Sequence, residues 1–236
     1  MSKLLALSIN DFRNIFRERI LYFMFVGAPV IMFLAARYVI PLLGDHFPVI
    51  APYYGFILML QIFNVVGGIG FVVASIILDE RDEDVLTMLK ITPITANFFI
   101  AYRLLFSVLI SFLYGLAMIL FTGLVEMTVG QAVLSAFLLA AVTPIIVLTL
   151  ATFSSNKVEG LAIYKALNLV LTLPAVSFFL ATKFQYFFWV IPVYWSFRWF
   201  MEGVDGQFAF WVLGVGLLVN VGVIVGLGRV FRGRVF

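Results

Sequence analysis

Six long apolar stretches are the feature that most narrowly limits the fold of this chain. A helix needs roughly 20 apolar residues to cross the hydrocarbon core of a bilayer. Six stretches reach that length, over residues 20–40, 53–78, 98–125, 132–153, 161–181 and 208–227. Each run is continuous, unlike the alternating polar and apolar pattern of a membrane β-barrel strand. The sequence therefore predicts one all-α integral membrane domain over residues 1–236, with six transmembrane helices.

The composition agrees with a bilayer environment and argues against several kinds of site. Hydrophobic residues make up 64% of the chain and charged residues 11%, whereas about 25% of the residues in a soluble domain are charged. Cysteine is absent and His46 is the only histidine, so we expect no metal site and no thiol chemistry. The net charge of +3 is too small and too scattered to indicate nucleic-acid binding. We therefore expect the chain to contact membrane lipid and not to bind nucleic acid.

The distribution of basic residues predicts the orientation of the chain. An even number of spans places both termini on one side. Of the 15 lysines and arginines, only Arg37, Lys183 and Arg198 fall on the other side. Because positive residues gather on the cytoplasmic side, we expect a multi-pass protein of the cytoplasmic membrane with both termini inside.

The segment before the first span, residues 1–19, has the pattern of an amphipathic helix. Its apolar residues recur at spacings of three and four, as on one helical face: Leu5, Ile9, Phe12 and Phe16. We predict an interfacial helix along the inner membrane surface, in which Arg13 and Arg17 face anionic headgroups. The alternative is a solvated lead-in to the first span.

Between the second and third spans the chain turns abruptly polar, in the run DERDEDVLTMLK from Asp79 to Lys90. Five of the chain's 12 acidic residues fall between Asp79 and Asp84, and such a cluster cannot lie in lipid. A short apolar stripe follows, made by Val85, Leu86 and Leu89. We predict a short cytoplasmic helix that docks a partner; the alternative is a solvated charged loop.

Local signals explain several other polar residues. Thr92 followed by Pro93 matches a helix N-cap with proline at the first helical position. Asn156 with Glu159 three residues later matches a capping box, so neither is taken as catalytic. Arg103 lies near the cytoplasmic end of its span, and its side chain is expected to extend toward the membrane surface.

Aromatic residues crowd the region before the last span. Nine of the fifteen residues between 186 and 200 are aromatic, and Pro192 interrupts the run. This pattern predicts interfacial or re-entrant helices between the fifth and sixth spans. The aromatic side chains form either an anchoring belt or an outer gate for an amphipathic substrate.

The spans themselves contain few polar groups. Gln61, Asn64 and Asn168 are the notable ones, suited either to hydrogen bonds between helices or to a substrate path. No chain of buried acids and histidines of the kind used by proton-coupled transporters is present. Gly222 and Gly226 form a GxxxG pattern, typical of close helix packing.

The sequence contains no G-x-x-x-x-G-K-[ST] phosphate loop, so the energy for active transport would have to come from another subunit. The chain resembles the permease subunits of type-2 ABC exporters. The resemblance rests on NDFRNIFRERI before the first span, on DERDEDVLTMLKITPIT between spans two and three, and on IPVYW before the last span. Asp84-Val85 replaces the glycine-threonine usual in the family after the acidic residues. SSNKVEGLAIYK is similar to a bacterial subgroup of drug exporters.

The resemblance implies a permease subunit that pairs with a second copy or a paralogue and with separate ABC ATPase subunits, which bind the ATP. The transported compound would be hydrophobic or amphipathic. The residues expected to couple to the ATPase are Asp79, Glu80, Arg81, Asp82, Glu83, Asp84, Leu86 and Leu89. The substrate-path candidates are Gln61, Asn64, Asn168, Tyr194 and Trp195.

Two other functions are weighed against this one. The first is an ATP-independent channel or facilitator, which the absence of a proton relay does not exclude. The second is a membrane enzyme acting on lipid. Against the enzyme, the chain lacks paired intramembrane carboxylates, a histidine-rich metal site and a nucleophile with a base. We therefore expect no catalytic residue.

Overall fold

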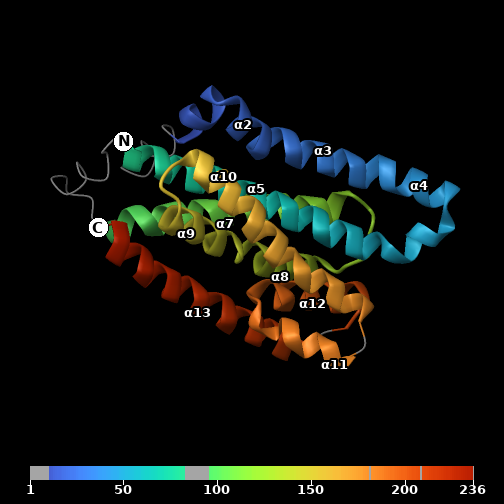
Figure 1. The fold of residues 1–236 in the computed structure, drawn as a ribbon. Coiled ribbons are helices and arrows are strands. Elements are labelled where there is room, and N and C mark those ends of the chain that lie inside the picture. Colours follow the sequence, from blue (N-terminus) through green and yellow to red (C-terminus); the bar gives the residue numbers. More distant parts are fainter. Residues whose placement is uncertain (1–10, 83–95, 181, 208, 236) are drawn as a thin grey trace.

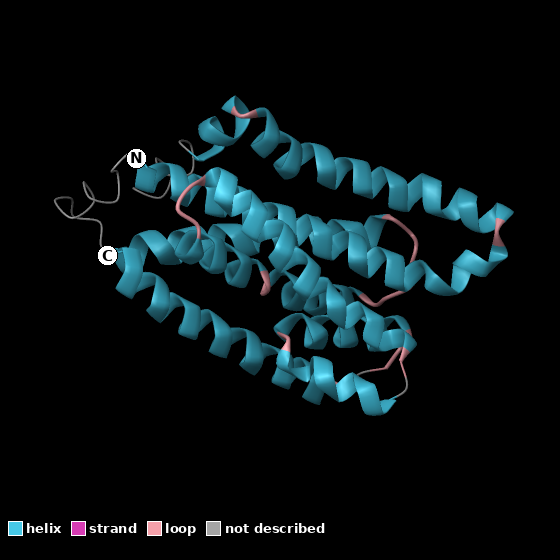
Figure 2. Cartoon of the chain, in the orientation of Figure 1, coloured by secondary structure: helices cyan, strands magenta, loops and turns pink. Residues whose placement is uncertain are grey.

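The structure is a helical bundle, seen in a computed structural model that describes residues 11–82, 96–180, 182–207 and 209–235. Within these residues every regular element is helical and no strand occurs (Figure 2). Six segments are long and apolar enough to cross a membrane: Arg19–His46, Pro48–Asp82, Ile100–Phe121, Val129–Phe153, Lys157–Phe179 and Phe210–Arg234. The predicted all-α fold with six spans is therefore confirmed.

The first span is one long helical segment with two widened turns. It consists of α2 (Arg19–Tyr22), α3 (Ala28–Leu34) and α4 (Ile40–His46), joined by the π-helical turns η1 (Phe23–Gly27) and η2 (Ala35–Val39). Each π turn contains the residue four positions before a proline, Pro29 or Pro41. Proline lacks a backbone N–H and crowds that carbonyl, so the wider turn relieves the clash.

The second and fourth spans form the centre of the bundle. The second is α5 (Tyr54–Asp82), preceded by the 3-10 turn η3 (Pro48–Tyr53), and the fourth is α8 (Val129–Ala140) followed by α9 (Thr143–Phe153). Most of their residues are buried within the chain. Gly70 lets α5 approach α9, because a Cβ atom there would lie 2.9 Å from Cγ2 of Ile146.

The remaining spans surround this centre. They are the first span, α7 (Ala96–Phe121), α10 (Lys157–Thr172) with its 3-10 extension η4 (Leu173–Phe179), and α13 (Phe210–Val235). Only 17–28% of the residues in their spanning windows are buried within the chain. In Figure 1 the first span and α13 lie on opposite sides of α5. Neither Gly222 nor Gly226 on α13 would bring a Cβ atom within 4 Å of a described neighbour, so the GxxxG pattern is not used for packing among the described residues.

Short helices join the fifth and sixth spans, as predicted: α11 (Thr182–Gln185), the 3-10 turn η5 (Tyr186–Val190) and α12 (Pro192–Val204). Tyr186 and Phe187 are exposed, as an anchoring belt requires. Tyr194 and Trp195 on α12 are only 2% and 4% exposed. The belt interpretation is therefore wrong for α12, because its aromatic side chains pack against neighbouring helices.

The two ends of the bundle can be told apart by the chain segments that they carry. The start of the first span, α2, and the last turn of α13 lie at one end, called here the terminal end, and the turn after α4 lies at the far end (Figure 1). At the terminal end Asn156 caps α10, accepting a hydrogen bond of 3.0 Å from the backbone N–H of Glu159. The Glu159 carboxylate accepts from the backbone N–H of Ser155 at 2.6 Å. The predicted Asn156 cap is confirmed, but Glu159 bonds the residue before the N-cap and not the N-cap N–H that a capping box requires.

Candidate coupling site

Three consecutive residues at the terminal end of α5 contact three different neighbours. Successive residues of an α-helix are rotated by about 100° from one another, so neighbouring side chains point in different directions. Asp79 pairs with Lys157 of α10 at 2.5 Å. Glu80 pairs with Arg103 of α7. Arg81 donates to the carbonyl oxygens of Ala151, at 3.4 Å, and Ser154, at the end of α9.

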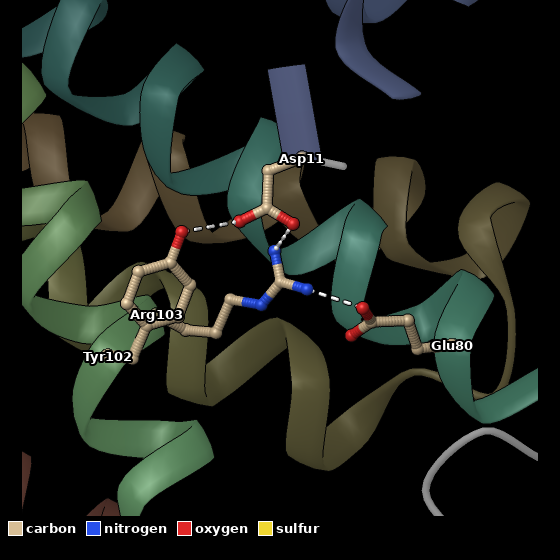
Figure 3. Close-up of polar contacts among 4 residues, drawn as sticks. All are labelled: Asp11, Glu80, Tyr102 and Arg103. Carbon is tan, nitrogen blue, oxygen red and sulfur yellow. Dashed lines mark hydrogen bonds and ion pairs between the residues drawn. The ribbon is translucent and has the colours of Figure 1, made fainter. Parts of the chain in front are cut away.

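The contact of Glu80 belongs to a buried ionic group, shown in Figure 3. Nη1 of Arg103 lies 2.6 Å from Oδ1 of Asp11, while its Nη2 donates to Oε1 of Glu80. The hydroxyl of Tyr102 donates to Oδ2 of Asp11 at 3.0 Å. Asp11 and Arg103 are both 0% exposed, and Glu80 is 8% exposed. One guanidinium therefore joins the N-terminal segment, the second span and the third span, inside the protein.

Arg103 was expected to extend toward the membrane surface, and this prediction is wrong. The guanidinium stays inside because two carboxylates from different parts of the chain compensate its charge there. A signal in the sequence could have revealed this: Arg103 interrupts a long apolar run, and a charge within a span nearly always has a partner. The identity of the partner could not be read, since Asp11 lies far away along the chain.

Burial raises the pKa of Asp11 above its ordinary value, because the loss of water around the carboxylate outweighs the attraction of Arg103. The ionised carboxylate is thus held in an unfavourable place by a single cation. Continuum arguments and experiments agree that a buried ion pair adds little net stability, while the removal of one partner is costly. The group therefore fixes how the three elements are arranged more than it stabilises them.

A second ionic contact ties the N-terminal segment to the bundle. Nζ of Lys157 binds both Asp79 and Glu18, which lies just before α2. This contact is partly exposed, so it contributes less than a buried pair would. Together with Asp11, Glu18 attaches the segment at two points about two helical turns apart.

The described part of the predicted interfacial helix, residues 11–17, is helical. Phe12, Arg13, Phe16 and Arg17 are all exposed, as expected for a helix at a membrane surface. Phe12 also packs edge-on against Phe106 of α7, with ring centroids 5.8 Å apart. Asp11 lies outside the predicted apolar stripe, yet the structure buries it against the bundle. Leu5 and Ile9 lie outside the described residues.

The predicted coupling residues divide into three groups. Asp79, Glu80 and Arg81 make contacts within the chain, as described above. Asp82 is exposed at the end of α5. Glu83, Asp84, Leu86 and Leu89, with the predicted docking helix, lie outside the described residues. The contacts of the first group place the last turn of α5 against α7, α9 and α10, directly before the acidic segment.

The substrate-path candidates fall in two separate places. Gln61, Asn64 and Asn168 belong to the packed pair α5 and α10, where the rings of Phe71 and Tyr164 lie 5.2 Å apart. Asn168 lies about one turn, and Asn64 about two turns, further from the terminal end than this contact. Tyr194 and Trp195 lie on α12, which also contacts α5, but their side chains pack in another cluster with Leu138 and Val212.

The three amides do not bond across helices among the described residues. Asn64 is exposed and donates to the carbonyl of Leu60, one turn away on its own helix, at 2.8 Å. Asn168 is half-buried, and its Oδ1 accepts from the hydroxyl of Thr172 on its own helix at 3.4 Å. Oε1 of Gln61 is buried without a partner among the described residues. The expected hydrogen bonds between helices are therefore absent in this part of the chain, and the amides remain open to other groups.

A cleft at the far end adjoins Tyr194. Its volume is about 380 Å³, and it lies between α12 and the end of the fifth span. Arg198 and Glu202 border it and bond to each other at 2.8 Å, while the guanidinium of Arg198 stacks on Trp211 at 4.8 Å. Trp195 does not line this cleft; its indole N–H donates to the carbonyl of Trp189 at 3.0 Å.

Comparisons with known proteins agree with a transport role. Residues 11–228 match the protein family described as "Fluoroquinolones export permease protein Rv2686c-like". Two fluoroquinolones export permease proteins of Mycobacterium tuberculosis, from strains CDC 1551 / Oshkosh and ATCC 25618 / H37Rv, are each 28% identical to this chain over 243 aligned positions. The alignments cover 98% of this chain and 94% of each relative. No solved structure matches the chain. The chain therefore belongs to the Rv2686c-like family of fluoroquinolones export permease proteins.

Proposed function

We propose that this permease is the membrane subunit of an ATP-driven exporter, and that separate ABC ATPase subunits bind and hydrolyse the ATP. In this proposal both termini face the cytoplasm, and the acidic segment after Asp82 receives the ATPase. The compound moved across the cytoplasmic membrane is hydrophobic or amphipathic. A second copy of the chain, or a paralogue, completes the transport path.

The observation that carries the proposal is the set of contacts made by the last described turn of α5. Asp79, Glu80 and Arg81 connect this turn to α7, α9 and α10. Arg103 and Lys157 in turn bind the N-terminal segment. Closely packed helices transmit displacements instead of absorbing them, because protein interiors have low compressibility. A displacement applied after Asp82 would therefore move several spans together, which is what coupling to an external motor requires.

The positions of the amides support a shared transport path. Asn64 is exposed in the middle of a span, and an amide in hydrocarbon costs roughly 2–7 kcal/mol where it lacks a hydrogen-bond partner. Polar groups in spans usually face a protein partner or water. The face of α5 and α10 that carries Asn64 and Asn168 is thus better suited to a second subunit and a wet path than to lipid.

The proposal is tested by purifying the permease together with an ABC ATPase encoded beside its gene. We expect the two to co-purify, and a transported compound to stimulate ATP hydrolysis only when the permease is present. Transport by the permease alone in vesicles, without ATP, would contradict the proposal and favour a facilitator.

The orientation has its own test, for which the absence of cysteine is convenient. We expect the Asp82→Cys variant to react with a membrane-impermeant maleimide only after cells are permeabilised. Asp45→Cys, at the exposed far end of the first span, provides the matched position and should react in intact cells. The reverse pattern would overturn the orientation.

A further inference from the structure

A groove at the terminal end combines an apolar interior with a basic rim. Its volume is about 490 Å³, and it lies between the first turns of α7 and the last turns of α13. The apolar lining includes Ile100 and Leu104 on α7, Ile224 on α13 and Leu148 on α9. The rim carries Arg229 and Arg232, both exposed. Among the described residues, no acidic side chain lines it.

The groove opens where the protein meets the bilayer. Exposed residues of both helices line it, Ala101 on α7 and Val225 on α13, so the slot between them faces outward and not into the bundle. Leu148, 1% exposed, closes it from behind. From Ile224 to Arg232 the groove follows α13 for about 12 Å at 1.5 Å per residue. It thus runs from the level of the terminal arginines into the depth of the span.

Arg229 and Arg232 differ in their surroundings from Arg234, the third arginine of α13. Arg229 and Arg232 are three residues apart and therefore share one face of α13. Arg234 instead lies over the ring of Phe153, at 4.9 Å, and does not line the groove. The guanidinium group binds a phosphate through two parallel hydrogen bonds, which suits it to a phospholipid headgroup.

A glycine keeps the middle of the groove open. A Cβ atom at Gly228 would meet no described atom within 4 Å, although this residue lines the groove directly below the arginines. Glycine lowers helix stability by about 1 kcal/mol relative to alanine. The space that it leaves is filled by no described side chain and matches an acyl chain that enters from the bilayer.

From these features we infer that the groove between α7 and α13 is a binding site for one anionic phospholipid of the inner leaflet. Arg229 and Arg232 hold its phosphate, and an acyl chain lies along Gly228, Ile224 and Leu104. The site requires the orientation given under the proposed function, because anionic lipids and basic residues meet at the cytoplasmic surface. It requires neither the ATPase nor a transported compound.

The test uses the full-length permease in mild detergent and native mass spectrometry. Phosphatidylglycerol and phosphatidylcholine with identical dioleoyl chains are the probes. We expect the wild type to bind one phosphatidylglycerol more tightly than one phosphatidylcholine. Each basic residue near an anionic headgroup contributes about 1 kcal/mol, so Arg229→Gln and Arg232→Gln should each weaken phosphatidylglycerol about fivefold. Gly228→Leu should weaken both lipids.

Two matched controls keep the inference falsifiable. Arg234→Gln removes the same charge outside the groove, and Gly222→Leu adds the same side chain to α13 where a Cβ atom also meets nothing within 4 Å. Both should bind lipid as the wild type does. Equal affinity of the wild type for the two lipids would overturn the inference. So would an effect of Arg234→Gln as large as that of Arg232→Gln, or full displacement of the lipid by glycerol phosphate. None of these outcomes touches the proposed transport function, which this assay does not measure.

Discussion

At the scale of single residues, Arg103 has the most demanding environment in the described chain. It is fully buried and compensates the carboxylates of Asp11 and Glu80, which come from two other elements. The cost of this arrangement is asymmetric. Loss of the arginine would leave two buried carboxylates facing each other, whereas loss of one carboxylate charge would still leave the arginine paired.

We therefore predict that Arg103→Met destabilises the purified permease by about 3–5 kcal/mol, the usual cost of breaking a buried ionic pair. Asp11→Asn should cost clearly less, because its amide oxygen can still accept the hydrogen bond from Tyr102 and Glu80 still pairs with Arg103. Thermal unfolding in detergent, compared with the wild type, measures both. Equal losses for the two variants would contradict this view of the ionic group.

At the scale of helices, close packing at the centre depends on small residues of α5. We predict that Gly70→Ala lowers the free energy of unfolding by about 1–3 kcal/mol, because the added Cβ atom would lie 2.9 Å from Ile146 and force α5 and α9 apart. Gly222→Ala on α13 is the matched change, because its Cβ atom would meet nothing described within 4 Å. The same unfolding assay checks the pair. A destabilised Gly222→Ala variant, or an unaffected Gly70→Ala variant, would contradict the close packing of α5 against α9 at Gly70.

The helices themselves could be predicted from the sequence to a large extent. Continuous apolar runs determine the spans, because the bilayer requires a minimum length. Local signals such as Asn156 with Glu159 predicted a helix start, since the interacting residues are near neighbours in the chain. The π turns of the first span and the burial of Tyr194 and Trp195 were not predicted. The π turns follow from Pro29 and Pro41, a local signal that the length of the apolar run does not reveal. The burial of Tyr194 and Trp195 depends instead on packing between distant segments, which no local pattern encodes.

The candidate site could be predicted only in part, for the same reason. The acidic run located the end of α5, because five charges cannot lie in lipid. The partners of Asp79, Glu80 and Arg81 come from α10, α7 and α9. Each of these contacts brings together residues far apart in the sequence, so composition and periodicity could not reveal it.

At the scale of the whole molecule, the amides of Asn64 and Asn168 predict where water reaches the spans. We expect an Asn168→Cys variant to react with a membrane-impermeant thiosulfonate reagent in the assembled transporter, since this face is proposed to line the transport path. Leu218→Cys is the matched position, because Leu218 is 75% exposed on α13 and should face lipid. It should react at least about tenfold more slowly. Comparable rates at the two positions would remove the support for a wet path along α10.

In the proposed function, the ATPase acts on the chain beyond the last described turn of α5. The most direct measurement is substrate-stimulated ATP hydrolysis by the purified complex carrying Asp82→Lys, with Asp45→Lys at the opposite end of the bundle as its matched control. Asp82 and Asp45 are both exposed. Because like charges brought together at an interface cost several kcal/mol, we predict a loss of stimulation of about tenfold or more for Asp82→Lys and none for Asp45→Lys. If the Asp82→Lys complex assembled and was stimulated by substrate as the wild type is, the ATPase would not act at this end of α5.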